Sequence, residues 1–167
     1  MSITINESGM TFGPFSEDDF FDIEKILHKN PIGKGVCKVE FVVLTNNSKV
    51  NYSVVFVEAK SSIPREFNKF FENIYIKMIH SITVWFTIVC GRHSQFNDYL
   101  PKNFNDLKCV RLPIKLILVI PSAPDEALSP LTDKFRQYFI IEKKIWAINY
   151  ENIRVVNRSR ATQLGLA

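Results

Sequence analysis

The feature that most constrains the fold is a pair of apolar, β-branched runs separated by a short polar segment. The first run, GVCKVEFVVLT, covers residues 35–45, and the second, NYSVVFVEAK, covers residues 51–60. The intervening NNSK segment is rich in residues that favour turns. Two such runs joined in this way predict a β-hairpin that turns between Asn46 and Lys49.

Each strand of this hairpin carries an acid in an otherwise apolar run. Glu58 and Lys60 stand two residues apart at the end of the second strand, so their side chains point to the same face. Glu40 interrupts the first strand. A register that brings Glu40 opposite or nearly opposite Glu58 makes the two carboxylates neighbours on one face. Adjacent carboxylates disfavour joint ionisation, and a divalent cation such as Mg²⁺, which prefers oxygen ligands, relieves that conflict.

A simpler account of these residues stays open at this point. The same acid-x-lysine spacing occurs at Asp106 and Lys108 and again at Glu142 and Lys144, so spacing alone is weak evidence. The pair at positions 58 and 60 differs because it ends a buried strand, where a carboxylate is costly unless something compensates it. An ion pair between Lys60 and Glu58 at the sheet edge is the alternative to a metal site.

A third acid lies on a predicted N-terminal helix that runs from about Glu17 to Lys29. Ser16 is a suitable N-cap for this helix, and apolar residues recur along it at helical spacing. Glu24 borders the apolar face, which makes it a candidate third metal ligand or a partner of a metal-bound water. A glutamate that reaches solvent beside the apolar face explains the position equally well.

The rest of the chain alternates between helices and strands. A long amphipathic helix is predicted from Arg65 to near Gly91, with a strand as the alternative for its β-branched end, residues 82–89. The first residues, 3–15, are expected to form a short strand or an arm. Later segments are predicted as a strand, a helix, a strand and a frayed tail, at residues 114–121, 131–141, 144–150 and 158–167. This order predicts one mixed α/β domain over residues 1–167 with a single central sheet.

Composition narrows the class of protein. The formal net charge of +4 permits an anionic partner. The three cysteines, at positions 37, 90 and 109, show neither zinc-like spacing nor an even number for disulfides. The N-terminus lacks the regions of a signal peptide, and the most apolar stretch, residues 79–90, is too short to span a bilayer. We therefore expect a soluble cytoplasmic protein with reduced thiols and no membrane partner.

The arrangement of acids and elements resembles the PD-(D/E)xK nuclease superfamily. FFDIEKIL, KVEFVVL and VVFVEAKSS carry the resemblance, which covers about residues 17–121 and leaves residues 122–167 as a C-terminal extension. It implies a restriction-endonuclease-like αβββαβ core whose central mixed sheet is flanked by helices. The pattern departs from the family in two respects. Glu40 follows Val39, where the family has Asp after Pro. The sequence also shows one clear hairpin where the family has three strands, and MTFGPF and a segment near Gly33 are the candidates for the third strand.

The resemblance implies a nuclease that uses Mg²⁺ or Mn²⁺ to hydrolyse phosphodiester bonds, with DNA as the expected substrate. Glu40 and Glu58, with Glu24 as the third candidate, would hold the metal. Lys60 would position the attacking water and neutralise charge on the phosphate. The alternative is a catalytically inactive domain of the same fold that binds nucleic acid or a protein partner.

Flanking polar residues are weaker candidates for contacts with phosphate. They follow the strand, lie on the next helix or stand near the C-terminus: Ser61, Ser62, Arg65, Lys69, Arg154, Arg158 and Arg160. The two serines serve equally well as helix caps, and solvated surface is the simpler interpretation of the lysine and the arginines. The apolar stripe of the long helix is a candidate homodimer face wherever the fold leaves it exposed.

Overall fold

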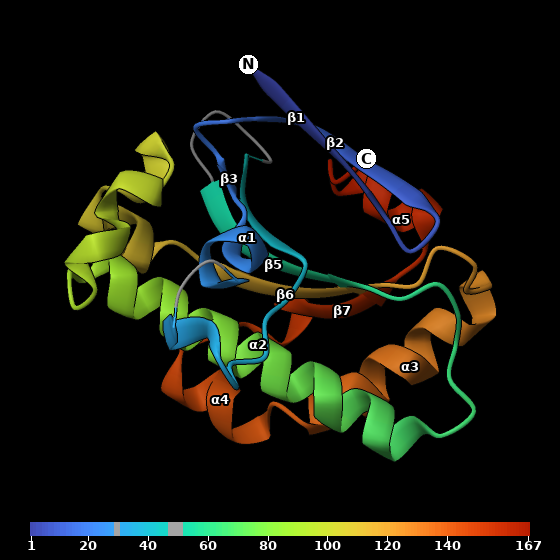
Figure 1. The fold of residues 1–167 in the computed structure, drawn as a ribbon. Helices are drawn as coiled ribbons and strands as arrows, with labels where there is room; N and C mark the ends of the chain where they lie inside the picture. The colour runs from blue at the N-terminus through green and yellow to red at the C-terminus, as the bar shows by residue number, and fades with distance from the viewer. Residues whose placement is uncertain (29–30, 47–51) are drawn as a thin grey trace.

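The computed structural model describes residues 1–28, 31–46 and 52–167. Its centre is a five-stranded mixed sheet with strand order β3-β4-β5-β6-β7 (Figure 1). These strands are β3 (Phe20–Phe21), β4 (Phe41–Asn46), β5 (Tyr52–Ala59), β6 (Ile114–Val119) and β7 (Ile153–Val156). The first three pair antiparallel, whereas β5, β6 and β7 run parallel. Parallel neighbours require crossover connections, and helices supply both of them.

Two layers cover the sheet. One face packs against α1, the long helix α2 and the α3–α4 pair, and the other packs against a separate hairpin, β1–β2, and the C-terminal helix α5 (Figure 1). The helices are α1 (Ile23–His28), α2 (Phe67–Val89), α3 (Asp125–Gln137), α4 (Ile140–Ile145) and α5 (Arg158–Gln163). The hairpin strands are β1 (Ser2–Glu7) and β2 (Met10–Ser16). Short 3₁₀ helices occupy Pro31–Gly33, Ser94–Tyr99, Lys102–Phe104, Leu107–Arg111 and Tyr150–Asn152.

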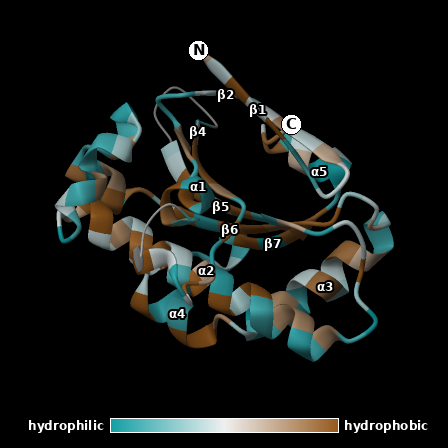
Figure 2. Ribbon diagram, viewed as in Figure 1, coloured by the Kyte–Doolittle hydropathy of each residue, from teal (hydrophilic) through white to brown (hydrophobic). Residues whose placement is uncertain are grey.

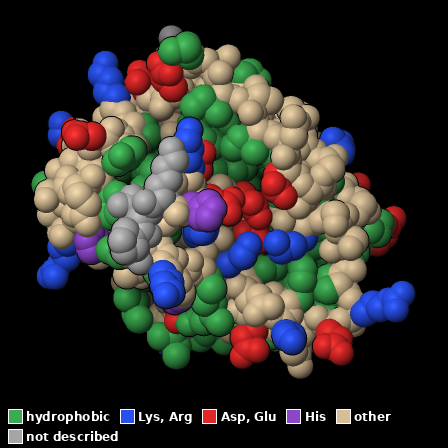
Figure 3. All heavy atoms as spheres, in the orientation of Figure 1, with side chains coloured by type: hydrophobic (Ala, Val, Ile, Leu, Met, Phe, Trp, Pro, Cys, Tyr) green, Lys and Arg blue, Asp and Glu red, His purple; other side chains and the backbone are tan. Residues whose placement is uncertain are grey.

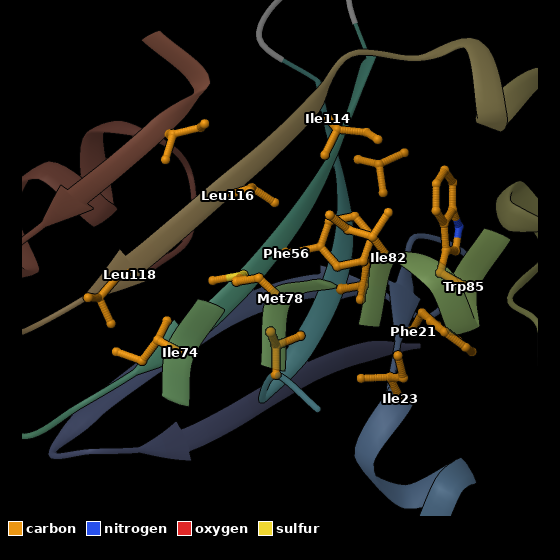
Figure 4. Close-up of a cluster of buried hydrophobic side chains, with 14 of the residues drawn as sticks. Phe21, Ile23, Phe56, Ile74, Met78, Ile82, Trp85, Ile114, Leu116 and Leu118 are labelled. Atoms are coloured by element: carbon orange, nitrogen blue, oxygen red, sulfur yellow. The ribbon is translucent and has the colours of Figure 1, made fainter. Parts of the chain in front are cut away.

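The alternation of side chains along the strands divides the core into two. On β5, Val54 and Phe56 join the cluster beneath α2, whereas Val55 and Val57 join the cluster beneath the β1–β2 hairpin. Figure 4 shows side chains of α2 directed at the β5 and β6 residues of the first cluster. The central strands are accordingly the most hydrophobic part of the ribbon (Figure 2). Because both faces are covered, these strands need the nearly continuous apolar sequence that they have.

Three of the predicted elements are confirmed. The hairpin forms as β4 and β5 in antiparallel register, although β4 begins only at Phe41. Most of its predicted turn, residues 47–49, lies outside the described residues. The long helix is α2, which stays helical through residues 82–89, and the apolar run at 114–121 contains β6.

The predicted helix at 17–29 is wrong in its first half. Phe20 and Phe21 form β3 and pair with Val43 and Val42, so the two rings enter opposite cores instead of sharing a helical face. The helix starts only at Ile23, where the Asp22 carboxylate accepts the N–H of Lys25 at 2.9 Å and caps it. β3 is also the third antiparallel strand. MTFGPF instead forms β2, and Gly33 lies in a 3₁₀ helix.

The C-terminal predictions are also wrong in part. The predicted helix at 131–141 begins earlier and divides into α3 and α4. The last strand is β7, at 153–156, instead of the segment at 144–150, where α4 ends. The tail forms α5, and Ala161 and Leu166 are buried in the core beneath the hairpin. The region beyond residue 121 therefore belongs to the central sheet and to both cores.

Most of the apolar stripe of α2 is buried within the protein. Six of its apolar residues are buried against the sheet: Phe71, Ile74, Met78, Ile82, Trp85 and Ile88. Of the large apolar side chains that are exposed in the described residues, none lies on α2. A homodimer through this helix stays a prediction. Across the described ranges, no helix combines the length and the apolar character that a bilayer crossing requires.

Candidate functional site

Glu58 lies near the carboxyl end of β5, on the face that packs against α2. Its position follows from strand alternation, because Val54 and Phe56 point the same way. The side chain is completely buried. One carboxylate oxygen, Oε1, accepts a hydrogen bond from the Lys77 ammonium at 2.6 Å and forms an ion pair with the Lys60 ammonium, also at 2.6 Å. The other oxygen, Oε2, is buried and has no hydrogen-bond partner among the residues that the structure describes.

Glu40 stands immediately before β4 and continues its pairing with β5. Its N–H donates to the Val57 carbonyl at 3.1 Å, one step beyond the pair of Phe41 with Val57. This extension of the register puts Glu40 across from Glu58 and on the same face. Its side chain is only 16% exposed, and its Oε1 lies 3.8 Å from the Lys77 ammonium. The structure thus brings Glu40, Glu58 and Lys60 together.

The electrostatic environment of Glu40 disfavours its ionised form. Burial, followed by the charge of Glu58, raises its pKa from 4.5 to about 7, even though Lys77 acts in the opposite direction. Glu7, at the end of β1, adds to the increase. An additional positive charge close to this carboxyl group would favour its ionised form.

Lys60 follows β5 directly. Its N–H donates to the Val119 carbonyl at 2.9 Å, which continues the parallel pairing of β5 with β6 by one residue. The backbone is therefore fixed, and the side chain reaches back to Glu58 while remaining 35% exposed. Ligands of α/β proteins commonly bind at the carboxyl ends of parallel strands, which is where this lysine stands.

Lys77 on α2 is the member of the cluster that the sequence analysis missed. Burial lowers the pKa of this lysine, but the carboxylates of Glu58 and Glu40 outweigh burial and raise it above its ordinary value. A local signal does exist. Lys77 lies one helical turn from the buried residues Ile74 and Ser81, so it borders the apolar stripe. The acids that it meets come from distant segments, and no local pattern identifies them.

Two side chains of α2 also hold the segment that leads into Glu40. The buried hydroxyl of Ser81 accepts the N–H of Val39 at 2.9 Å. Nδ1 of His80 accepts the N–H of Cys37 at 3.1 Å. The position of Glu40 therefore depends on α2 as well as on the strand ladder.

The other predicted site residues lie outside this cluster. Glu24 is exposed on α1, and within the described part of the chain no group of three or more His, Cys, Asp or Glu residues is arranged to hold a metal. The residues after β5 that were candidates for phosphate contacts are all exposed: Ser61, Ser62, Arg65 and Lys69. The C-terminal arginines bond locally or to the hairpin. Arg158, for example, donates to the Gly9 carbonyl at 2.7 Å.

Figure 3 shows acidic and basic side chains next to one another on the face between the β1–β2 hairpin and α2. Surface hollows of about 510 and 580 Å³ lie around β2, β3 and α1, and Glu40, Glu58, Lys60 and Lys77 line neither of them. The candidate site is therefore a partly covered cluster of four charges, two negative and two positive.

The donor set of this cluster fits a divalent cation. The buried Oε2 of Glu58 is a ligand atom without a partner among the described residues, and burial together with the charge of Glu58 raises the pKa of the neighbouring Glu40. Mg²⁺ is often bound through only one or two carboxylates and keeps several water molecules. Glu40 and Glu58 would supply those carboxylates. Comparisons with protein-family models, with curated proteins and with solved structures return no match.

Proposed function

We propose that this protein is a Mg²⁺-dependent nuclease of the PD-(D/E)xK type that hydrolyses phosphodiester bonds in DNA. The observation that carries the proposal is the carboxylate of Glu58, which is fully buried and has one oxygen unpaired. Beside it lie a second acid, Glu40, and the lysine of the Glu-x-Lys pattern. Burying a carboxylate with one oxygen unpaired costs stability, and acids with perturbed pKa values cluster at functional sites.

The topology supports the same proposal. Three antiparallel strands, β3, β4 and β5, are followed by the crossover helix α2 and the parallel strand β6. This order supplies the βββαβ part of an αβββαβ core. The first helix departs from that pattern, because α1 lies between the first and second strands of the sheet instead of before them.

Each residue of the cluster has a role in this proposal. Glu40 and Glu58 would hold the cation. A divalent ion bound there lowers the pKa of a coordinated water and stabilises negative charge on the phosphate. Lys60, which is partly exposed, would leave Glu58 to orient the water and to neutralise charge on the scissile phosphate. Exposed Arg65 and Lys69 would contact the backbone of the nucleic acid without reading its sequence.

A second candidate is a catalytically inactive domain that binds nucleic acid or a protein. The two ammonium groups on Oε1 of Glu58 favour it, because they balance the two acids and close an ion-pair network without any metal. Such a network is a complete structural account of Lys60 and Lys77. The two candidates differ in one measurable respect, which is whether the acids bind a metal.

The deciding experiment is a calorimetric titration of Mn²⁺, together with a plasmid-nicking assay, on the wild type and on Glu58→Gln. The nuclease proposal predicts that metal binding and nicking are both lost in the variant, which keeps the shape of the side chain. Glu126→Gln, at an exposed acid of α3, is the matched control and should retain both. Metal binding without nicking in the wild type would favour the inactive domain, and absence of both would refute the metal site.

The same assays on Glu24→Gln test whether the third predicted acid is a metal ligand. Its exposure on α1 predicts metal affinity and nicking within about twofold of the wild type, as expected for a surface substitution. A tenfold loss of affinity would instead restore Glu24 as a ligand in the metal-bound state.

A further inference from the structure

Lys77 contacts both acids of the candidate site. Its ammonium lies 2.6 Å from Oε1 of Glu58 and 3.8 Å from Oε1 of Glu40. Lys60, the other lysine of the cluster, forms an ion pair with Glu58. Among the ion pairs of the described residues, the one with Glu40 is made by Lys77. The ammonium of Lys77 therefore neutralises the same two carboxylates that a divalent cation would bind.

The helix holds the stem of Lys77 while its end can move. α2 is anchored by residues that are fully or almost fully buried one turn away or next to Lys77, among them Ile74 and Met78. The side chain of Lys77 is itself 30% exposed. A lysine has a flexible four-carbon stem and a compact charge, so its ammonium can leave one partner without a shift of the helix.

We propose that Lys77 is the resident counter-ion of Glu40 and Glu58, and that a divalent cation must displace its ammonium to bind. This inference rests on the metal site of the proposed function. A positive charge within 4 Å of both ligands repels an incoming cation strongly, because the site is only partly open to water. Lys77 thus stabilises the metal-free protein and at the same time weakens its affinity for the metal.

The test compares Mn²⁺ affinity in the wild type, Lys77→Gln and Lys77→Arg by calorimetry. Removal of the charge should tighten Mn²⁺ binding about tenfold in Lys77→Gln, because one repelling charge close to the ligands is lost. Lys77→Arg keeps the charge and should stay within about threefold of the wild type. Lys144→Gln is the matched control, since it removes an exposed lysine from α4, and it should leave the affinity unchanged. Equal or weaker binding by Lys77→Gln overturns the inference.

Thermal unfolding provides a second readout that does not depend on catalysis. Without metal, Lys77→Gln leaves Glu40 with no ion pair among the described residues and should melt at a lower temperature than the wild type. Added Mn²⁺ should raise the Tm of this variant more than that of the wild type. Lys77→Met preserves the apolar stem and replaces Lys77→Gln if the latter does not fold. An equal rise of the Tm in variant and wild type contradicts displacement.

The nicking assay separates this inference from the proposed function. Tighter metal binding by Lys77→Gln, with no nicking by the wild type, would support the counter-ion and refute the nuclease. Nicking by the wild type, with equal affinities in both proteins, would refute the counter-ion and leave the nuclease standing. Absence of Mn²⁺ binding in every variant would overturn the counter-ion proposal together with the metal site.

Discussion

Glu40 and Glu58 are both removed from water, and they differ in how lysines compensate their negative charges. Glu58 has no exposed surface and receives two lysines on one oxygen, whereas Glu40 is 16% exposed and has one lysine at 3.8 Å. Burial, followed by the charge of Glu58, raises the pKa of Glu40 to about 7, and Lys77 opposes this increase only in part. Near neutral pH the protonation state of Glu40 is therefore sensitive to any charge that is added or removed beside it.

The raised pKa of Glu40 predicts how stability depends on pH in the metal-free protein. The folded state holds this proton up to about pH 7, whereas the unfolded chain releases it near pH 4.5. The free energy of unfolding should therefore fall as the pH rises from 5 to 8, by up to about 3 kcal/mol relative to Glu40→Gln, which cannot titrate. Urea denaturation of both proteins at several pH values measures the difference. A constant difference across this range would show that Glu40 is ionised throughout.

At the scale of elements, α2 organises the site. It contributes Lys77 to the cluster, and it holds the segment before β4 through His80 and Ser81. The sequence predicts this helix well because its apolar stripe is long and regular. The hydrogen bonds of His80 and Ser81 could not be predicted. Their partners are backbone N–H groups roughly forty residues away, which no local pattern locates.

The hydroxyl of Ser81 supplies a prediction at this scale. Ser81→Ala leaves the N–H of Val39 buried without its acceptor, which should cost about 1–3 kcal/mol of stability. Because the released segment carries Glu40, Mn²⁺ affinity should fall as well. Thr83→Ala is the control, since this exposed hydroxyl bonds only within α2, to the Ile79 carbonyl. Unfolding and metal titration of both variants test the idea, and equal values for both would contradict it.

At the scale of the whole molecule, the success of prediction depends on whether an element is determined locally. β5, β6 and α2 have strong patterns of their own and form where the sequence indicates, and β4 forms in the second half of its predicted run. In sequence, Phe20 and Phe21 fit the apolar stripe of a helix. In the structure they form a strand instead, because they pair with the edge of β4. β7 shows the same dependence on context, because this short run becomes a strand only beside β6. Nonlocal pairing overrides local preference at both edges of the sheet.

The two ends of the chain close the second core together. The β1–β2 hairpin and the C-terminal segment lie on the same face of the sheet, and the Leu166 carbonyl accepts the N–H of Gly13 at 3.0 Å (Figure 1). Leu166 is 1% exposed, although it is the penultimate residue of the chain. A frayed end would tolerate truncation of this side chain, whereas a core position would not.

Leu166→Ala should therefore destabilise the protein by about 2–4 kcal/mol, because it opens a cavity between the hairpin and the sheet. Leu164→Ala, two residues earlier at a half-buried position, is the matched control and should cost about 1 kcal/mol or less. Urea denaturation measures both losses. Equal and small losses would mean that the C-terminal segment detaches from the sheet before the rest unfolds. A large loss for Leu166→Ala alone would establish that both chain ends belong to one cooperative unit, which also holds the hairpin carrying Glu7 close to Glu40.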